Sequence, residues 1–183
     1  MKIIFLLPPD PLHVILLGPV QDIINTLKKL YPDLMPTFFL RCGIGKRRTQ
    51  IGGNFTGGEL KMILKEGNLA HLAEIIDHGV EVTQCLRSLR ELHKMCVKKT
   101  YSEDHEAFIE DYANKFKVMR DLKLMSFTTK SHIILHHISY YMSETGLSLY
   151  TADTSPQEST HSGRTRRCTT FCPCTSSAAL ASN

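Results

Sequence analysis

Two side chains near the start of the chain, Asp10 and His13, have the types and spacing for acid–base chemistry. Prolines precede and separate them, which restricts the backbone at this point. Near the other end of the chain, Glu158 and His161 have the same spacing. Two such pairs are compatible with a two-metal phosphoryl-transfer site, in which carboxylates hold the ions. Capping or solvated surface acids explain the same residues, so both interpretations remain open.

A second group of chemically active side chains is formed by histidines. His132 and His136 are four residues apart, which places them on one face of a predicted helix and is a spacing that can share a metal ion. The residues between them are aliphatic, so the general-base glutamate of the His-Glu-x-x-His motif is missing. A third ligand would have to come from elsewhere, with His93 and Glu158 as the candidates. We therefore expect packed histidines and assign no metal site.

Residues 41–58 contain six glycines and four basic side chains, which predicts a long surface loop. The loop lacks the Gly-Lys-Ser/Thr ending of a phosphate-binding loop and has no Gly-x-Gly-x-x-Gly motif, so a nucleotide pocket is not predicted. Contact with a polyanion backbone and a simple solvated loop remain the two interpretations. The candidate binding residues are Arg41, Lys46, Arg47 and Arg48.

Composition limits the class of protein. The 183 residues are 42% hydrophobic, enough for one domain with a buried core. Of the net charge of +4, three arginines lie after residue 162, and residues 1–162 carry 19 basic against 18 acidic side chains. This balance argues against a strongly basic nucleic-acid-binding domain, although a local basic stripe is compatible with it. Scattered cysteines and the lack of a signal peptide or an 18-residue apolar run predict a soluble, intracellular protein.

The elements that must position these side chains are mostly helices. Apolar residues 2–7 predict a short strand, and Gly18-Pro19 is expected to break the helix that begins at Leu12. We predict a mainly α, multi-helix bundle in residues 1–150 and a mostly disordered tail in residues 151–183. The expected helices span 12–17, 19–30, 33–39, 59–65 (ended by Gly67), 69–76, 80–99, 103–119 and 128–144.

A succession of motifs across roughly residues 7–162 resembles uncharacterised, mobile-element-derived animal proteins. These proteins are similar to DDE-type transposases, which have an RNase H-like catalytic core. The matching segments are 9–19 (Pro-Asp-Pro-Leu-His-x-x-Leu-Leu-Gly-Pro), 52–57 (Gly-Gly-Asn-Phe-Thr-Gly), 88–96 (Ser-Leu-Arg-x-Leu-His-x-Met-Cys), 130–134 (Lys-Ser-His-Ile-Ile), 140–146 (Tyr-Tyr-x-x-x-Thr-Gly) and 158–162 (Glu-Ser-x-His-Ser).

The resemblance implies roles for particular residues. Asp10-x-x-His13 would mark the end of the early core, helices 59–144 would be an insertion, and Glu158 would be the final catalytic acid. Asp10 and Glu158 are thus the candidate remnant catalytic residues, and a cofactor, Mg²⁺, is expected only if this relationship holds. No counterpart of the upstream strand that carries the first aspartate is visible, and the chain departs from the family after Gly163. We therefore expect a truncated remnant, inactive alone.

Two classes of function follow from these expectations. The first is a truncated transposon-derived protein whose remaining partners are DNA or a second copy of itself, with His13 and His161 beside the remnant site; no membrane partner is expected. The alternative is a helical protein–protein interaction module without catalytic ancestry. A small metal-dependent hydrolase using His132 and His136 is the least favoured interpretation.

Overall fold

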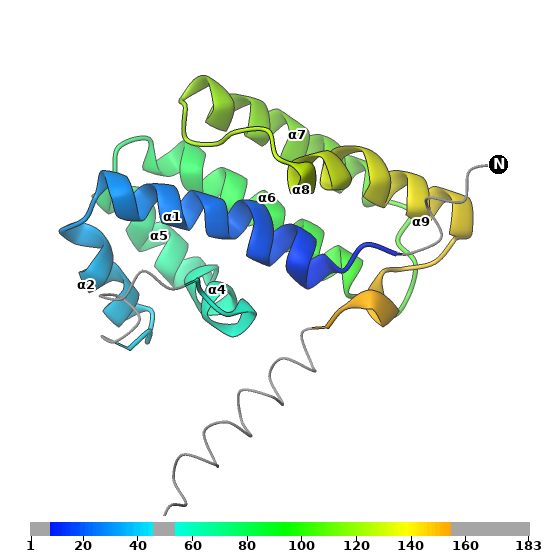
Figure 1. The fold of residues 1–183 in the computed structure, drawn as a ribbon, viewed down its shortest axis with the longest axis horizontal. Helices are drawn as coiled ribbons and strands as arrows, with labels where there is room; N and C mark the ends of the chain where they lie inside the picture. Colours follow the sequence, from blue (N-terminus) through cyan, green and yellow to red (C-terminus); the bar gives the residue numbers. More distant parts are fainter. Residues whose placement is uncertain (1–7, 46–53, 155–183) are drawn as a thin grey trace, which may run out of the picture.

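The computed structural model describes residues 8–45 and 54–154, and within these ranges the chain is helical, with no strand (Figure 1). The mainly α prediction is confirmed. The strand expected at residues 2–7 and most of the expected tail, residues 155–183, lie outside the described residues. The helices are η2 (Leu12–Val20), α1 (Gln21–Leu30), α2 (Leu34–Arg41), α4 (Gly57–Ile63), α5 (Glu66–Ile75), α6 (Gly79–Cys96), α7 (His105–Asp121), α8 (Thr129–His132), η3 (Ile133–Ile138), α9 (Ser139–Thr145) and the short turn η4 (Tyr150–Ala152).

The first helical unit, η2 continued by α1, runs through the middle of the molecule (Figure 1). The η2 part of this unit is mostly buried. Leu12, Ile15 and Leu16 are each at most 1% exposed. A helix that is apolar all round belongs in a core. The expected interruption at Gly18-Pro19 is confirmed as a kink: Gly18 has φ −113° and ψ −117°, outside helical values, after which the chain continues into α1.

The longest helix, α6, packs against α7, α5 and η2. The apolar positions of its predicted stripe recur every three or four residues, and all of them are buried. Arg87, Glu91 and Lys94 lie on the other side, where charged side chains can reach solvent. The buried stripe consists of Val82, Cys85, Leu86, Leu89, Leu92, Met95 and Cys96.

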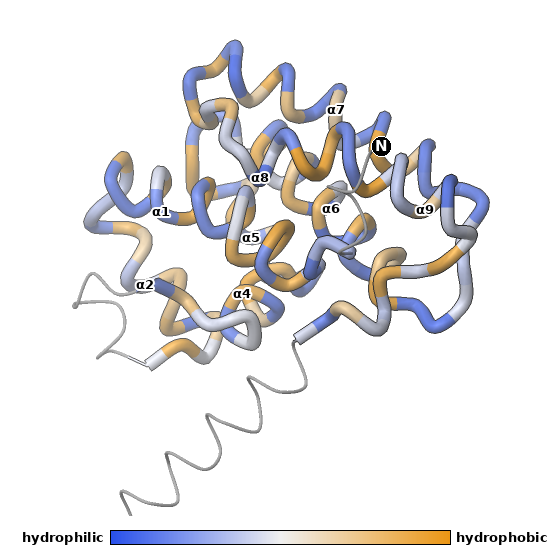
Figure 2. Tube along the Cα trace, turned by 45° about the vertical axis from the view of Figure 1, so that its right-hand side comes forward, coloured by the Kyte–Doolittle hydropathy of each residue, from blue (hydrophilic) through white to orange (hydrophobic). Residues whose placement is uncertain are grey.

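Two further helical units close the bundle. Helix α7 is amphipathic, which Figure 2 shows as alternating hydrophilic and hydrophobic colour along the tube, and it buries Tyr112, Phe116 and Met119. The segments α8, η3 and α9 follow one another without a break and form the helix predicted over 128–144. In this unit Lys130 donates a hydrogen bond from Nζ to the carbonyl oxygen of Leu17, which ties it to the kink in η2.

The helices on either side of the glycine-rich segment extend into both ends of the loop expected over residues 41–58. Arg41 is the last residue of α2, and α4 begins at Gly57. Thr56 and Glu59 form a capping box, in which each side chain accepts a hydrogen bond from the other residue's backbone N–H, and this starts the helix two residues earlier than predicted. The prediction that Gly67 ends a helix is wrong, because Gly67 lies inside α5.

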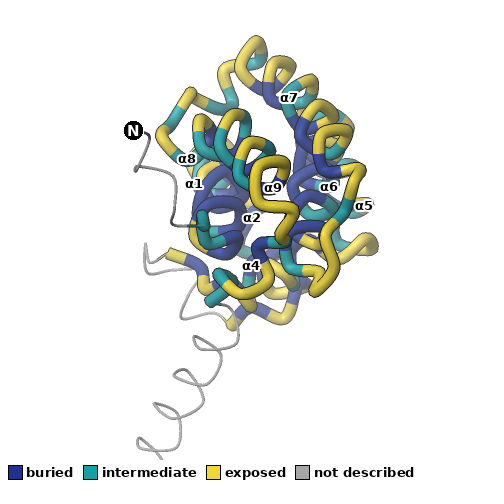
Figure 3. Tube along the Cα trace, turned by 90° about the vertical axis from the view of Figure 1, so that its right-hand side faces the viewer, coloured by how far each residue is buried: buried dark blue, intermediate teal, exposed yellow. Residues whose placement is uncertain are grey.

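The buried apolar side chains of both described ranges form one continuous core. Figure 3 shows exposed residues on the outer turns of α7 and α9, with buried residues toward the interior. None of the helices that the structure describes has the length and apolar character needed to cross a membrane.

We expect Gly79→Ala to lower the free energy of unfolding by about 1–3 kcal/mol, because an added Cβ would overpack the junction of α5 and α6. That Cβ would lie 2.7 Å from the Cα of Ala73. A backbone atom cannot move aside as easily as the end of a flexible side chain. Urea unfolding followed by circular dichroism measures the change.

Gly67→Ala is the matched control, since no atom lies within 4 Å of a Cβ at Gly67. Inside α5 the substitution should be neutral or stabilise by up to about 1 kcal/mol. Equal stability of the two variants would contradict the close packing at Gly79.

Candidate functional site

The Asp10 carboxylate is the centre of a compact polar cluster. Its Oδ2 atom lies 2.6 Å from His13 Nδ1 and accepts a 2.6 Å hydrogen bond from Thr154 Oγ1. Its Oδ1 atom accepts from the backbone N–H of Leu12 at 2.9 Å and from that of Thr154 at 3.4 Å. The expected pairing of Asp10 with His13 is therefore present, together with a third member that sequence reasoning did not identify.

Two segments 144 residues apart build this cluster. Asp10 stands just before η2, and its carbonyl oxygen accepts the first helical hydrogen bond, from Val14 N–H at 2.9 Å. Thr154 follows the turn η4, which lies at the same end of the molecule as the start of η2 (Figure 1). Asp10 thus caps the start of η2 and fastens it to the last described residues.

The electrostatics of the cluster keep Asp10 ionised. Partial burial alone would raise the pKa of Asp10. Hydrogen bonds from Thr154, His13 and the Leu12 N–H outweigh that effect and hold the pKa below its usual value. With Asp10 charged, Nδ1 of His13 is the atom that donates. A carboxylate offers about four lone-pair positions, and here four donors of the chain itself occupy them.

The other predicted site residues divide into two groups. Arg41 is exposed at the end of α2. The remaining candidates, Lys46, Arg47, Arg48, Glu158 and His161, lie outside the described residues, and their roles stay predictions.

The histidines of the last helix lie close together. The ring centroid of His132 is 4.8 Å from that of His136 and 4.9 Å from that of His137. Burial lowers the pKa of His137, and the nearby His132 and His136 lower it further. Nevertheless, no set of three or more His, Cys, Asp or Glu side chains in residues 8–45 and 54–154 is placed to hold a metal ion. The geometry gives no support to a hydrolase built on His132 and His136.

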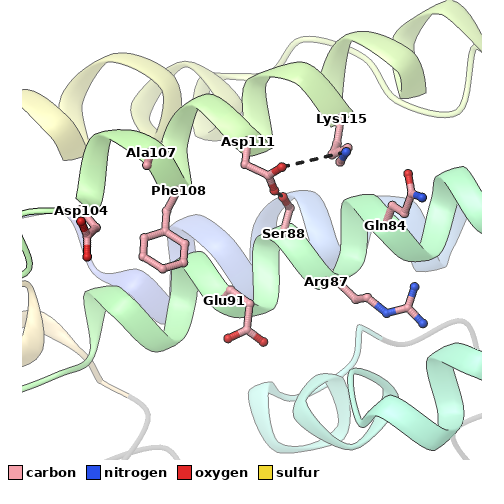
Figure 4. A pocket seen from close by; sticks show the side chains of 9 residues that line it. All are labelled: Gln84, Arg87, Ser88, Glu91, Asp104, Ala107, Phe108, Asp111 and Lys115. Carbon is pink, nitrogen blue, oxygen red and sulfur yellow. Dashed lines mark hydrogen bonds and ion pairs between the residues drawn. The ribbon is translucent and has the colours of Figure 1, made fainter.

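A cavity of about 520 Å³ lies between α6 and α7 (Figure 4). Most of its charged groups are paired with other side chains. Asp111 accepts a short hydrogen bond from Ser88 Oγ and lies 3.9 Å from Lys115 Nζ. Arg87 pairs with Glu66 of α5 at 2.7 Å. This cavity therefore has little charge left over for a ligand.

A second cavity, of about 420 Å³, lies between η2, α4 and α6. Basic side chains surround it, and it contains the buried imidazole of His93. Sequence reasoning considered His93 only as a metal ligand and missed this cavity. Two signals were present: a histidine inside the apolar stripe of α6, and Lys61 and Lys65 four residues apart on either side of Leu64.

Burial is the main reason that the pKa of His93 falls to about 4. Lys61 lowers it further, while Asp153 and Asp10 act in the opposite direction. His93 is therefore neutral at pH 7. Its Nε2 atom is buried and has no hydrogen-bond partner among the residues described.

Comparisons with protein-family models, with curated proteins and with solved structures found no match for this chain. The functional argument therefore rests on the sequence of this chain and on the geometry of its described residues.

We expect the stability of the fold to fall as the pH drops from about 6.5 toward 4, because the unfolded chain protonates His93 in this range and the folded chain does not. With an unfolded pKa of about 6.5, the loss amounts to about 2 kcal/mol at pH 5. The measurement is the free energy of unfolding in urea at pH 7.5 and at pH 5.

His93→Gln is the comparison variant, since it removes the titrating ring but keeps a polar side chain. Its difference in stability between the two pH values should be smaller than that of the original chain by about 2 kcal/mol. A parallel pH dependence in both proteins would show that His93 titrates normally.

Proposed function

We propose that this chain is a transposon-derived helical protein that is catalytically inactive on its own and retains the capacity to bind nucleic acid. The order of motifs from Pro9 to Ser162 supports the ancestry. The chemistry at Asp10 supports the loss of activity, and the distribution of cations supports the binding role.

The single observation that carries the proposal is the saturation of Asp10. A catalytic carboxylate of a DDE-type site would have to present lone pairs to Mg²⁺. At Asp10 these positions are occupied by His13, Thr154 and the Leu12 N–H. The described surroundings of Asp10 therefore do not fit the ion, and Asp10 serves as a cap and a fastening point for η2.

The position of Asp10 is compatible with the proposed ancestry. The resemblance requires Asp10 and Glu158 to belong to one region of the protein. Thr154 contacts Asp10 and precedes Glu158 by only four residues in the sequence.

Nucleic-acid binding is assigned to the basic segment rather than to the whole surface. Charge in residues 1–162 is nearly balanced, so a binding face must come from local concentration. Arg41 is exposed where α2 ends, and Lys46, Arg47 and Arg48 follow within seven residues. Side chains of this kind neutralise backbone phosphates and give affinity without sequence specificity.

We expect replacement of Arg41, Lys46, Arg47 and Arg48 by Gln to weaken binding to duplex DNA and to flatten its salt dependence. Each lost phosphate contact lowers the slope of log K against log salt by about 0.9, so the change is at most about 3.6. Fluorescence anisotropy with a labelled duplex at several salt concentrations measures both quantities.

The control replaces four exposed cations elsewhere, Lys98, Lys117, Arg120 and Lys123, by Gln and should leave the slope unchanged. An equal effect of both sets of substitutions would show that DNA binding depends only on the net charge of the protein. Cleavage of the duplex in Mg²⁺ by the original chain, abolished by Asp10→Ala, would contradict inactivity.

One observation favours the alternative of a helical interaction module. Leu30, Leu34 and Leu40, on α1 and α2, expose 54%, 44% and 42% of their surface. Large apolar side chains at the surface are typical of contacts with another protein or a second copy. Concentration-dependent sedimentation without DNA binding would favour this alternative.

A further inference from the structure

The cavity between η2, α4 and α6 has an apolar interior and a basic entrance. Leu16 of η2 and Leu64 at the end of α4 line its buried part, where they are 1% and 2% exposed. Lys61 of α4 and Lys65, which directly precedes α5, are exposed and line the same cavity. At about 420 Å³, its volume falls within the range of small-molecule sites.

Not all of the cations at this cavity are used by the fold. Arg90 binds Glu66 at 2.9 Å and Glu91 at 2.8 Å, and Lys94 binds Glu91 at 2.9 Å. By contrast, the described part of the chain supplies no ion pair to Lys61 or Lys65, although both line the entrance. Two positive charges are therefore available to an anion.

A polar atom in the interior points to a ligand independently of the charges. His93 is only 5% exposed, lines the cavity, and leaves its buried Nε2 atom without a partner. Buried polar atoms in native proteins are nearly always hydrogen-bonded, so one left unsatisfied calls for a missing partner. A ligand that enters the cavity can supply that partner.

We propose that this cavity binds a small organic anion whose charged head lies at Lys61 and Lys65 and whose apolar body reaches inward against Leu16 and Leu64. A polar atom of the ligand meets Nε2 of His93. Phosphate esters and carboxylates share this chemistry. The α6–α7 cavity lacks these properties because its two cations, Arg87 and Lys115, are already paired with Glu66 and Asp111. The site shares no residue with the basic segment assigned to nucleic acid and does not depend on that assignment.

The test is isothermal titration calorimetry of the full chain with 2-naphthyl phosphate and 2-naphthoate, compared with 2-naphthol and inorganic phosphate. At least one of the two organic anions should bind saturably with one site per chain, at least tenfold more tightly than the neutral alcohol or the inorganic ion. The better of the two identifies the head group. The same ligand should shift the ¹⁵N resonance of His93 Nε2.

Lys61→Gln/Lys65→Gln should weaken binding of that anion about tenfold or more, since both head-group contacts are lost. Both positions are exposed, so the variant should fold normally. Lys117→Gln/Lys123→Gln removes the same charge from the surface of α7 and the turn after it and should bind as the original chain does. The proposal is overturned if neither anion saturates at millimolar concentration, if the two double variants bind equally, or if His93 does not respond.

Discussion

Burial of the apolar helix η2 is the constraint on which the rest of the structure depends. Apart from the exposed His13 near its start, its side chains are apolar and mostly buried, and α4, α6 and α8 all pack against it. The kink at Gly18 lets the chain turn into α1, and Lys130 supplies a donor to the carbonyl oxygen of Leu17 beside it. Gly18 leaves little space for anything larger, since a Cβ there would lie 2.9 Å from Lys130 Cδ.

The burial of η2 affects two polar residues that lie next to it, Asp10 and His93. The backbone N–H groups at the start of a helix need acceptors, and at η2 the nearest carboxylate is Asp10. Once Asp10 caps η2 and holds Thr154, its lone pairs are committed to the fold. At the same helix, Leu16 forms part of the interior of a cavity whose other wall carries His93. Helix η2 thus occupies the carboxylate of Asp10, and its residue Leu16 lines the same cavity as His93, whose Nε2 atom has no partner among the described residues.

Periodicity along the sequence predicted the helices well where one face is apolar, as in α6 and in the unit from α8 to α9. It failed where local features at helix ends decide. The Thr56–Glu59 capping box, which could have been recognised, starts α4 at Gly57, and Gly67 lies in the first turn of α5. Asp10 and His13 were identified because they are neighbours. Thr154 could not be, because its contact with Asp10 joins positions 144 residues apart. The cavity at His93 likewise arises only when three helices pack together.

The central claim is that Asp10 serves the fold and is not available to a divalent cation. Mn²⁺ titration followed by paramagnetic broadening of backbone amide signals tests it most directly. We expect the amide signals of Leu12, His13 and Thr154 to broaden no more than those of exposed acidic stretches such as that around Glu106, in the original chain and in Asp10→Asn alike. Selective, saturable broadening of these three signals that disappears in Asp10→Asn would contradict the claim and restore Asp10 as a metal ligand.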